Sequence, residues 1–508
     1  MRNLYLLPLL TRSPLHFLML LFGGLTFLTL SGCEKSDLSG PRYEAAAPQN
    51  QDLNGGTWKT ILLWSGNEIT VTAPVPAAAA TYQQELSEIK SLQAQLTKPQ
   101  REAISYWASG ATLRWNEIAR QLIAKYNVAP EVGAAPDPLT PFANPVLAAR
   151  IYALLSVAQY DALVAAWHHK LQFGRPAPAQ ADPGIKLLVP ASSLPAYPSE
   201  DAVLAAASSE ILKFIFPKEV DFLTQKANQH QDSRLWAGAN VRSDLAAGAA
   251  LGKQVALKVL DYARKDRMNL ARDANNTWQL AVVPVKWQSL EVPVRGPMLP
   301  LGGNVKTWYD STALAAGLPG PPPAVGSPEF NQALTEVRKI ADNRTREQWR
   351  IADFWADGAG TPTPPGHWNQ IAADLIRKNG YSELRAARTL ALMNRALMDA
   401  AICCWRTKYI YYLPRPSQLD PHIKTATGIP NFPSYTSGHA TFSGTASTIL
   451  GYIFPGNKND LTSQAEEAAT SRLYGGIHYR FDNEAGLTCG QNIGKVAIQW
   501  GQTDGSPQ

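Results

Sequence analysis

Apolar residues recur at helical spacing along most of the chain beyond residue 100. The stretch His439 to Phe454 sets five apolar residues on one face: Phe442, Ala446, Ile449, Leu450 and Ile453. Ala386 to Tyr412 has the composition of a long Ala/Leu/Met helix that ends near Pro414. Apart from a possible short pair of strands around Trp58 to Val71, no alternating strand pattern is evident. The pattern therefore predicts an all-α protein.

The helical pattern is written twice, at a constant offset of 238 in the numbering. Ala148 to Lys170 aligns with Ala386 to Lys408, and Pro195 to Pro217 aligns with Pro433 to Pro455. The same offset continues into the helices that follow. Because chance does not hold one offset over several segments, we infer an internal duplication. It predicts two pseudo-symmetric helical bundles packed together.

The repeat and the composition divide the chain into five parts. We expect a signal peptide at 1–32, a tether and N-terminal segment at 33–100, a first bundle at 101–260, a Pro-rich connector at 261–345 and a second bundle at 346–508. With 508 residues and 45% apolar content, the chain can fill more than one core. The formal net charge of +6 is spread without dense Lys/Arg runs, so no nucleic-acid partner is indicated.

The N-terminus has the features of an export signal. Arg2 and Arg12 precede the apolar run from Phe17 to Leu30, and small residues lead to Cys33. This resembles a bacterial lipoprotein signal, which implies that Cys33 carries the lipid. The mature protein would then be periplasmic or anchored at the outer membrane, touching the membrane only through acyl chains. An ordinary cleaved signal is the alternative.

Three cysteines remain after Cys33: Cys403, Cys404 and Cys489. The odd number cannot pair completely in an oxidising compartment. We expect small buried thiols on helices, with one bridge from Cys403 or Cys404 to Cys489 as the alternative.

The second copy collects an unusual set of polar groups in three short segments. They are, in chain order, Lys408 and Arg415, then Ser437, Gly438 and His439, then Arg472, His478 and Asp482. Cationic side chains, a hydroxyl and a backbone N–H at a helix start are the donors that a tetrahedral oxyanion needs. Taken singly, each residue has an ordinary explanation: a structural histidine, a solvated charge, or an Asp capping a helix. The three segments together, in order, favour one site.

These segments and their spacing resemble the signature of the superfamily of type 2 phosphatidic acid phosphatases and vanadium haloperoxidases. The resemblance implies that Lys408, Arg415 and Arg472 bind the oxyanion, with Ser437 and the Gly438 N–H completing the cradle. It further implies that His478 is the axial ligand or nucleophile, His439 the acid/base, and Asp482 the group that orients His478. Thr436 departs from the usual Pro before Ser-Gly-His, but that Pro supplies no catalytic atom.

The first copy lacks both histidines. It keeps Lys170, Arg175, Ser199, Arg234 and Asp244, but Asp201 stands where His439 does and Asn240 where His478 does. Glu200 and Asp201 would also repel an anion. We therefore expect one working site per chain and one relic kept for packing, with its charged remnants paired among themselves. A relic that binds a cation through Glu200 and Asp201 is the alternative.

Flanking residues favour a haloperoxidase. His478-Tyr479-Arg480-Phe481-Asp482 looks like the corresponding haloperoxidase segment, Trp405 and Phe432 match positions on the halide side, and Asp357 would pair with Arg472. Trp405 and Phe432 could equally be core aromatics, and Asp357 a loop turn residue. The resemblance implies a vanadate cofactor, with hydrogen peroxide, halide and a small organic acceptor as substrates.

Two other functions are open. A periplasmic acid phosphatase would use the same residues through a phosphohistidine at His478, with His439 protonating the leaving group and no cofactor. A lipoprotein with a vestigial site acting in surface binding is disfavoured, because the second copy is complete.

Overall fold

The computed structural model describes residues 41–128, 144–291 and 294–507. All secondary-structure elements assigned in these ranges are helices, which confirms the all-α prediction. The strand pair considered around Trp58 to Val71 is absent from the described chain; that stretch follows the short turn η1 (Leu53–Thr57) as bends and turns. The signal peptide and Cys33 lie outside the described residues.

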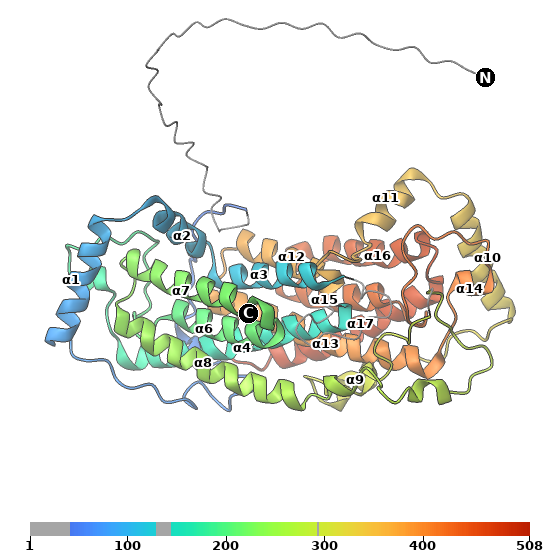
Figure 1. The fold of residues 1–508 in the computed structure, drawn as a ribbon, viewed down its shortest axis with the longest axis horizontal. Helices are drawn as coiled ribbons and strands as arrows, with labels where there is room; N and C mark the ends of the chain where they lie inside the picture. The colour runs from blue at the N-terminus through green and yellow to red at the C-terminus, as the bar shows by residue number, and fades with distance from the viewer. Residues whose placement is uncertain (1–40, 129–143, 292–293, 508) are drawn as a thin grey trace, which may run out of the picture. The chain divides into compact units, whose positions relative to one another are not determined.

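Two sets of four helices follow the same order along the chain (Figure 1). The first set is α4 (Pro145–Phe173), α6 (Glu200–Ile215), α7 (Val220–Trp236) and α8 (Arg242–Lys265). The second is α13 (Glu383–Tyr411), α15 (Gly438–Ile453), α16 (Lys458–Tyr474) and α17 (Arg480–Gly501). Each helix of the second set begins at the same offset from its counterpart that the sequence repeat predicts. Common descent of the two halves stays a prediction.

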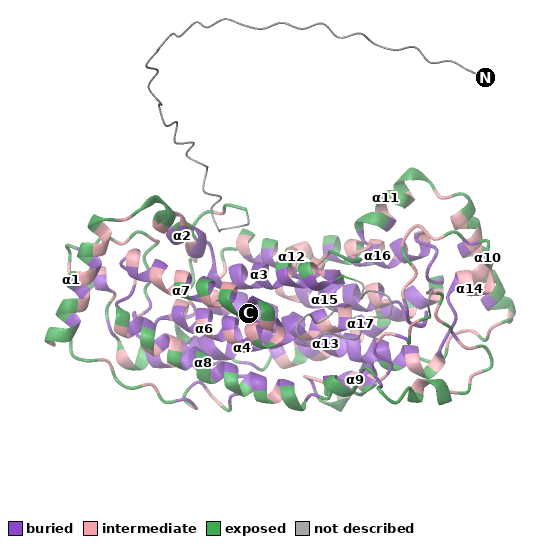
Figure 2. Ribbon diagram, viewed as in Figure 1, coloured by how far each residue is buried: buried purple, intermediate pink, exposed green. Residues whose placement is uncertain are grey.

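The two bundles meet along their longest helices, α4 and α13. Both are buried over nearly their whole length, which appears as the purple centre of Figure 2. Among the described residues, one stretch is long and apolar enough to cross a membrane: Pro145–Ala181, which comprises α4 and the short helix α5 (Pro178–Ala181). In its most apolar window, 89% of the residues are buried in the fold. Its apolar character is therefore that of a core helix.

The helices α3 (Ala111–Tyr126) and α12 (Thr363–Lys378) pack on each other and on this central pair. A buried hydrogen-bonded chain crosses the junction: Asn116 donates to Asn369 at 2.8 Å, Asn369 to Asn394 at 2.7 Å, and Asn394 to Ser156 at 2.9 Å. Because these side chains form hydrogen bonds with one another, burying them costs little free energy, and the bonds fix how the four helices pack.

Smaller helices surround the bundles. They are α1 (Ala80–Ala94), α2 (Lys98–Ala108), α5 (Pro178–Ala181), α9 (Ser311–Gly317), α10 (Pro328–Asp342), α11 (Arg346–Phe354) and α14 (Pro416–Leu419). The helix α2 packs on α7, and α11 packs on α16. The helices α9 and α10 lie within the expected Pro-rich connector and pack on α17 and α16 respectively.

Segments assigned to the tether and to the connector each complete one bundle. Gly56 of η1 lies on α4, where an added Cβ would come within 2.4 Å of the His168 nitrogen. Gly303 of η5 (Gly302–Asn304) lies on α13, where a Cβ would come within 2.4 Å of the Arg406 Cα. His168 and Arg406 hold corresponding positions in the repeat, so the two glycines pack at equivalent places on α4 and α13.

A buried carboxylate anchors each of these segments. Asp161 of α4 accepts the N–H groups of Ile61, Leu62 and Leu63 at 2.7, 2.7 and 3.0 Å. Asp399 of α13 accepts those of Trp308 and Tyr309 at 2.7 and 2.9 Å. The sequence does indicate that these two segments correspond, since GGTWKT at 55–60 matches GGNVKT at 302–307. The offset between them is 247, however, and not 238.

The three cysteines of the described chain are buried and free. The sulfur atoms of Cys403 and Cys489 lie 3.6 Å apart, on α13 and α17, without a bond. The expectation of buried thiols is thus met.

Candidate active site

One end of the second bundle brings the predicted polar residues together. Lys408 lies in the last turn of α13 and Arg472 in the last turn of α16. Ser437 caps α15 by accepting the Ala440 N–H, and Asp482 lies in the first turn of α17. The Ser437 N–H donates to the Asp482 carbonyl at 3.0 Å, which ties the starts of α15 and α17 together.

His478 is held in one tautomer by two contacts. Its Nδ1 lies 2.8 Å from Asp482 Oδ2, which also accepts the Ser434 hydroxyl at 2.5 Å and the Tyr479 N–H at 3.1 Å. Its Nε2 lies 2.9 Å from Arg415 Nη1, and a guanidinium can only donate. The proton is therefore on Nδ1 and the lone pair on Nε2. Burial, with Arg415 and Lys408 adding to it, lowers the pKa of His478 well below its usual value, so the ring is neutral.

Three cations surround this histidine. Lys408, Arg415 and Arg472 are at most 1% exposed. Lys408 donates to the carbonyl oxygens of Pro433, Ser434 and Thr436. Burial lowers the pKa of Lys408 to about 7 and the pKa of both arginines to about 10. Burial also raises the pKa of Asp482 to about 6. The positive charge of these three side chains favours binding of a negatively charged ligand.

Two of the guanidinium nitrogens for which the described residues offer no partner belong to this site. Arg415 Nη2 and Arg472 Nε are both buried and unbonded. Leaving a buried charged donor unpaired costs several kcal/mol at roughly the scale of a broken buried ion pair. An oxyanion accepting from both groups would remove this cost. Together with the Nε2 lone pair of His478, the donor set fits vanadate or phosphate.

His439 lies at the start of α15 and is half-buried. The other polar side chains of the site are fully buried. Its Nε2 is 3.2 Å from Arg472 Nη1. Burial lowers the pKa of His439 well below its usual value, and Arg472 lowers it further, so the neutral ring can accept a proton. A Cβ at Gly438 would make ordinary van der Waals contact with the side chains of Trp405 at 3.9 Å and Phe442 at 4.0 Å.

Two aromatic rings line the site. The ring centroids of Trp405 and Phe432 are 5.0 Å apart, and Lys408 Nζ lies 5.0 Å from the Phe432 ring. The Trp405 N–H donates to the Met298 carbonyl at 3.1 Å, which fixes the indole against the connector. Both residues predicted to flank the site therefore lie beside its cations.

Asp357 has a different partner from the one expected. Its carboxylate lies 3.2 Å from His367 Nδ1, while Arg472 donates to the Trp355 carbonyl at 2.5 Å and to the Thr427 hydroxyl at 3.4 Å. The stacking of His367 on Trp355, at 4.4 Å between centroids, brings the imidazole to the carboxylate. The expected Asp357–Arg472 pair is not among the ion pairs of the described residues; Asp357 acts on Arg472 only through its charge.

Ser434 and His367 were not predicted from the sequence. Ser434 lies three residues before Ser437, and His367 occurs in Pro365-Gly366-His367-Trp368 at the start of a helix. Neither pattern indicates the partner. Ser434 contacts Asp482, 48 residues further along the chain, and His367 contacts Asp357, 10 residues before it, through the path of a loop that spacing does not determine.

The first bundle's counterparts pair with one another, as predicted. Lys170 pairs with Glu200 at 2.5 Å and Arg175 with Asp244 at 3.0 Å. Asn240 accepts the Ser199 hydroxyl at 3.0 Å and donates to the Ala196 carbonyl at 2.9 Å. The groups that would bind an anion are thus occupied by side chains of the chain itself.

Comparison with known proteins gives a consistent picture. A family model of the PAP2 superfamily matches residues 389–506. A bacterial vanadium-dependent iodoperoxidase is 23% identical, with a TM-score of 0.60 over 76% of this chain and 96% of that chain. A bacterial vanadium-dependent chloroperoxidase is 15% identical in its holo form (TM-score 0.53, covering 76% of this chain and 97% of that one) and 14% identical in its apo form (0.52, 74% and 96%). No curated protein sequence matches. At these identities the likeness establishes the fold.

Proposed function

Since residues 389–506 carry the PAP2 superfamily domain in a chain with the fold of bacterial vanadium haloperoxidases, we propose that this protein is a vanadate-dependent haloperoxidase. It would oxidise halide with hydrogen peroxide to a hypohalous species. The observation that carries the proposal is the arrangement of three buried cations, with two unpartnered N–H groups, around a neutral imidazole.

The chain's own residues have separable tasks. Lys408, Arg415 and Arg472 hold the negative charge of the oxyanion, and the Ser437 hydroxyl and Gly438 N–H complete the cradle. His478 would bind the oxyanion through the Nε2 lone pair that now accepts from Arg415, and Asp482 keeps this lone pair on Nε2 by fixing the proton on Nδ1. Bound vanadate supplies the activation of hydrogen peroxide.

His439 is the group placed to move a proton. It is neutral and partly open, and it is held against Arg472. It takes a proton from incoming peroxide, and the Arg472 guanidinium beside it keeps the ring from holding that proton tightly. Trp405 and Phe432 form the apolar wall on which halide and organic acceptor approach.

An acid phosphatase would use the same cradle. The His478 Nε2 lone pair would attack phosphorus and His439 would protonate the leaving group. One experiment separates the two activities: peroxide-dependent oxidation of bromide or iodide, with and without orthovanadate, measured beside hydrolysis of p-nitrophenyl phosphate. We expect halide oxidation that requires vanadate. Phosphate hydrolysis that vanadate blocks, with no halide oxidation, would refute the haloperoxidase.

The repeat supplies a matched control for the site. His478→Ala removes the proposed axial group, and Asn240→Ala changes the corresponding position of the first copy. We expect the first variant to lose vanadate-dependent activity and the second to keep it. Vanadate-dependent activity that survives in His478→Ala would contradict the assignment of the site.

We further propose that the protein is an exported lipoprotein linked to the membrane through Cys33. The charged start, the apolar run and the small residues before Cys33 support this. Cys33→Ser should release the mature protein from the membrane fraction; a variant that stays membrane-bound would contradict the anchor.

A further inference from the structure

His439 is held by the segment 355–357, which connects α11 to α12. Arg472 Nη1 donates to the Trp355 carbonyl at 2.5 Å and lies 3.2 Å from His439 Nε2. Because a guanidinium only donates, the lone pair of the neutral ring is on Nε2 and its proton is on Nδ1. The backbone carbonyls of Ala356 and Trp355 also hydrogen-bond to the ring, and a carbonyl only accepts, so they bind the Nδ1–H. The segment therefore selects the tautomer in which Nε2 can take a proton.

The direction of the Ala356 carbonyl depends on the residue that follows it. Asp357 has a φ of 44°, in the left-handed region that few residues other than Gly, Asn and Asp adopt. Rotation about this bond turns the peptide plane that contains the Ala356 carbonyl. If Asp357 relaxed to a negative φ, the carbonyl would turn away from His439. The conformation of Asp357 thus directs the carbonyl at the ring.

His367 of α12 holds this segment at two points. Its Nδ1 lies 3.2 and 3.3 Å from the two carboxylate oxygens of Asp357. Its ring stacks on Trp355, with 4.4 Å between the centroids and 18° between the planes. Phe354 contacts the same imidazole edge-on, at 5.2 Å between centroids. His367 therefore fixes the residues on both sides of Ala356.

The first bundle makes the same connection with other residues. The segment WASGA at 107–111 matches WADGA at 355–359, and WNEIA at 115–119 matches WNQIA at 368–372. Ser109 therefore corresponds to Asp357, and Arg114 to His367. Arg114 Nε donates to the Ser109 hydroxyl at 2.9 Å. A hydrogen bond between this segment and the next helix is thus present in both copies, although both partners differ.

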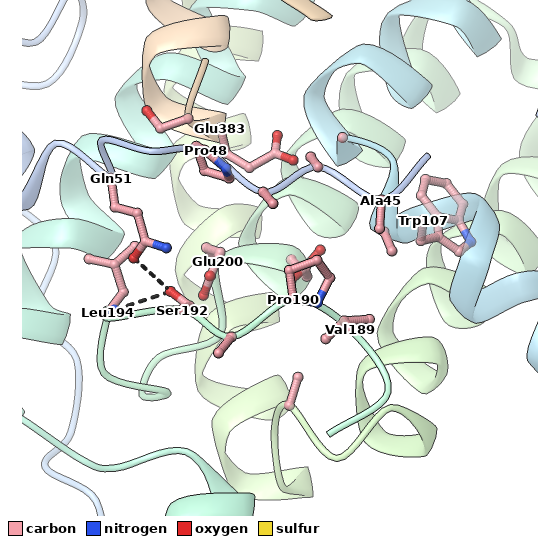
Figure 3. A pocket seen from close by; sticks show the side chains of 18 of the residues that line it. Ala45, Pro48, Gln51, Trp107, Val189, Pro190, Ser192, Leu194, Glu200 and Glu383 are labelled. Atoms are coloured by element: carbon pink, nitrogen blue, oxygen red, sulfur yellow. Dashed lines mark hydrogen bonds between the residues drawn. The ribbon is translucent and has the colours of Figure 1, made fainter. Parts of the chain in front are cut away.

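The carbonyl that this connection directs has a different partner in each copy. The Ala108 carbonyl, which corresponds to that of Ala356, accepts the Ala46 N–H at 2.7 Å. Figure 3 shows Ala45 of the same N-terminal segment and Trp107 at one wall of the first bundle's cavity, whose volume is about 460 Å³. In the first copy the carbonyl binds a backbone amide, whereas in the second it binds the group placed to move a proton.

We propose that His367 is a positioning residue, which fixes the lone pair of His439 on Nε2, where proton transfer takes place. It does so by holding Asp357 and Trp355, and with them the carbonyl that binds the Nδ1–H. The inference rests on the proposed role of His439. It applies to halide oxidation and to phosphate hydrolysis alike, because both would use Nε2 of this ring.

The tautomer of His439 can be measured without any activity. In full mature protein labelled with nitrogen-15 histidine, the NMR shifts of Nδ1 and Nε2 show which nitrogen carries the proton, and His439→Gln identifies the signals. We expect the Nδ1–H tautomer in the unmodified protein without vanadate. We expect a mixture of tautomers in His367→Phe, whose ring can stack on Trp355 but cannot bond to Asp357. An unchanged tautomer in His367→Phe would overturn the proposal.

Two substitutions of Asp357 separate its hydrogen bond from its charge. Asp357→Asn keeps an oxygen acceptor for His367 Nδ1 and tolerates the left-handed conformation, so it should retain the tautomer of the unmodified protein. Asp357→Ala loses the acceptor and is strained at positive φ, so it should give the mixture. A mixture in both variants would mean that the carboxylate acts through its charge, and it would contradict positioning by His367.

Kinetics provide a second readout. His367→Phe and Asp357→Ala should lower kcat by about tenfold, at the low end of the cost of losing a partner that orients a functional histidine. The KM for peroxide and the affinity for orthovanadate should stay nearly unchanged, whereas general loosening of the site would change all three. Ser109→Ala is the matched control, because it removes the corresponding bond of the first bundle and should leave kcat as it is. An equal loss of kcat in Ser109→Ala would contradict the assignment.

Failure of this proposal is distinguishable from failure of the proposed function. If the unmodified protein oxidises no halide but the tautomer changes in His367→Phe, the positioning role stands and the haloperoxidase fails. The same variants are then compared by hydrolysis of p-nitrophenyl phosphate. If halide oxidation is present and the tautomer is the same in both proteins, the haloperoxidase stands and the positioning role fails.

Discussion

Asp482→Asn is the substitution for which the structure gives the most definite expectation. One carboxylate oxygen of Asp482 accepts from Ser434, His478 and Tyr479 at 2.5, 2.8 and 3.1 Å. An asparagine keeps the shape but loses the charge, and its NH2 group can face His478 Nδ1. The imidazole proton then moves to Nε2, and the lone pair that faces the oxyanion is lost.

The expected loss can be placed on a scale. Removing a group that orients a ligating histidine typically costs about 10–100-fold in affinity for the bound group, or about 1.4–2.8 kcal/mol. The variant should also be less stable without vanadate. Taking one partner from a buried ionic cluster costs up to about 3–5 kcal/mol, here because Lys408 and Arg415 lose the charge of a nearby carboxylate. Burial of that carboxylate, which raises the pKa of Asp482 to about 6, is relieved in the variant and offsets part of this cost. Saturating orthovanadate should restore part of that stability by linkage.

The assay is equilibrium binding of orthovanadate together with urea unfolding in its presence and absence. Asp244→Asn is the control, since Asp244 holds the equivalent place and bonds Arg175 at 3.0 Å. It should cost stability without changing vanadate affinity. If Asp482→Asn binds vanadate as tightly as the unmodified protein, the tautomer argument is wrong.

Three more outcomes are expected. Vanadate affinity should fall as pH rises above about 7, because burial lowers the pKa of Lys408 to about 7 and this amine must be charged to bind an anion. Vanadate itself also titrates, so affinity is measured across pH 6–9 in both the unmodified protein and Lys408→Met. The difference between the two proteins isolates the contribution of Lys408. His439→Ala should keep vanadate affinity within a few-fold but lose about 10²–10⁴-fold in turnover, whereas His478→Ala loses tight binding; equal affinities in the two variants would contradict the roles. Gly303→Ala should lower the unfolding free energy by about 1–3 kcal/mol in urea, since its Cβ would lie 2.4 Å from the Arg406 Cα, while Gly358→Ala, with nothing within 4 Å, should not.

The helices were predictable because they depend on local spacing, and the gathering of the polar residues was predictable from the resemblance of their segments to a family signature. Apolar periodicity sets each helix, and the constant offset of the repeat aligns helix starts such as Glu200 with Gly438. Lys408, Arg472 and His478 were recognisable because their order and spacing resemble the signature of a known superfamily.

Other features were not predictable, because they depend on contacts between distant segments. The partner of Asp357 depends on how Trp355 stacks on His367, which spacing does not determine. The packing of Gly303 against α13 was not predicted, because the matching segments 55–60 and 302–307 are offset by 247 and not by 238. The sequence predicted that the charges of the first copy pair, but it gave no sign of the cavity that lies beside them.

The anchoring of 308–309 by Asp399 bears on how the catalytic half can be shortened. A fragment trimmed to the family match, residues 389–506, would begin inside α13 and would lack the backbone amides that this buried carboxylate accepts. It would also lack Gly303 and the α12 helix that carries Trp368, whose indole donates to Ser443 at 2.9 Å. The shortest autonomous piece must therefore begin upstream of Gly302, well before the region that sequence comparison marks as the domain.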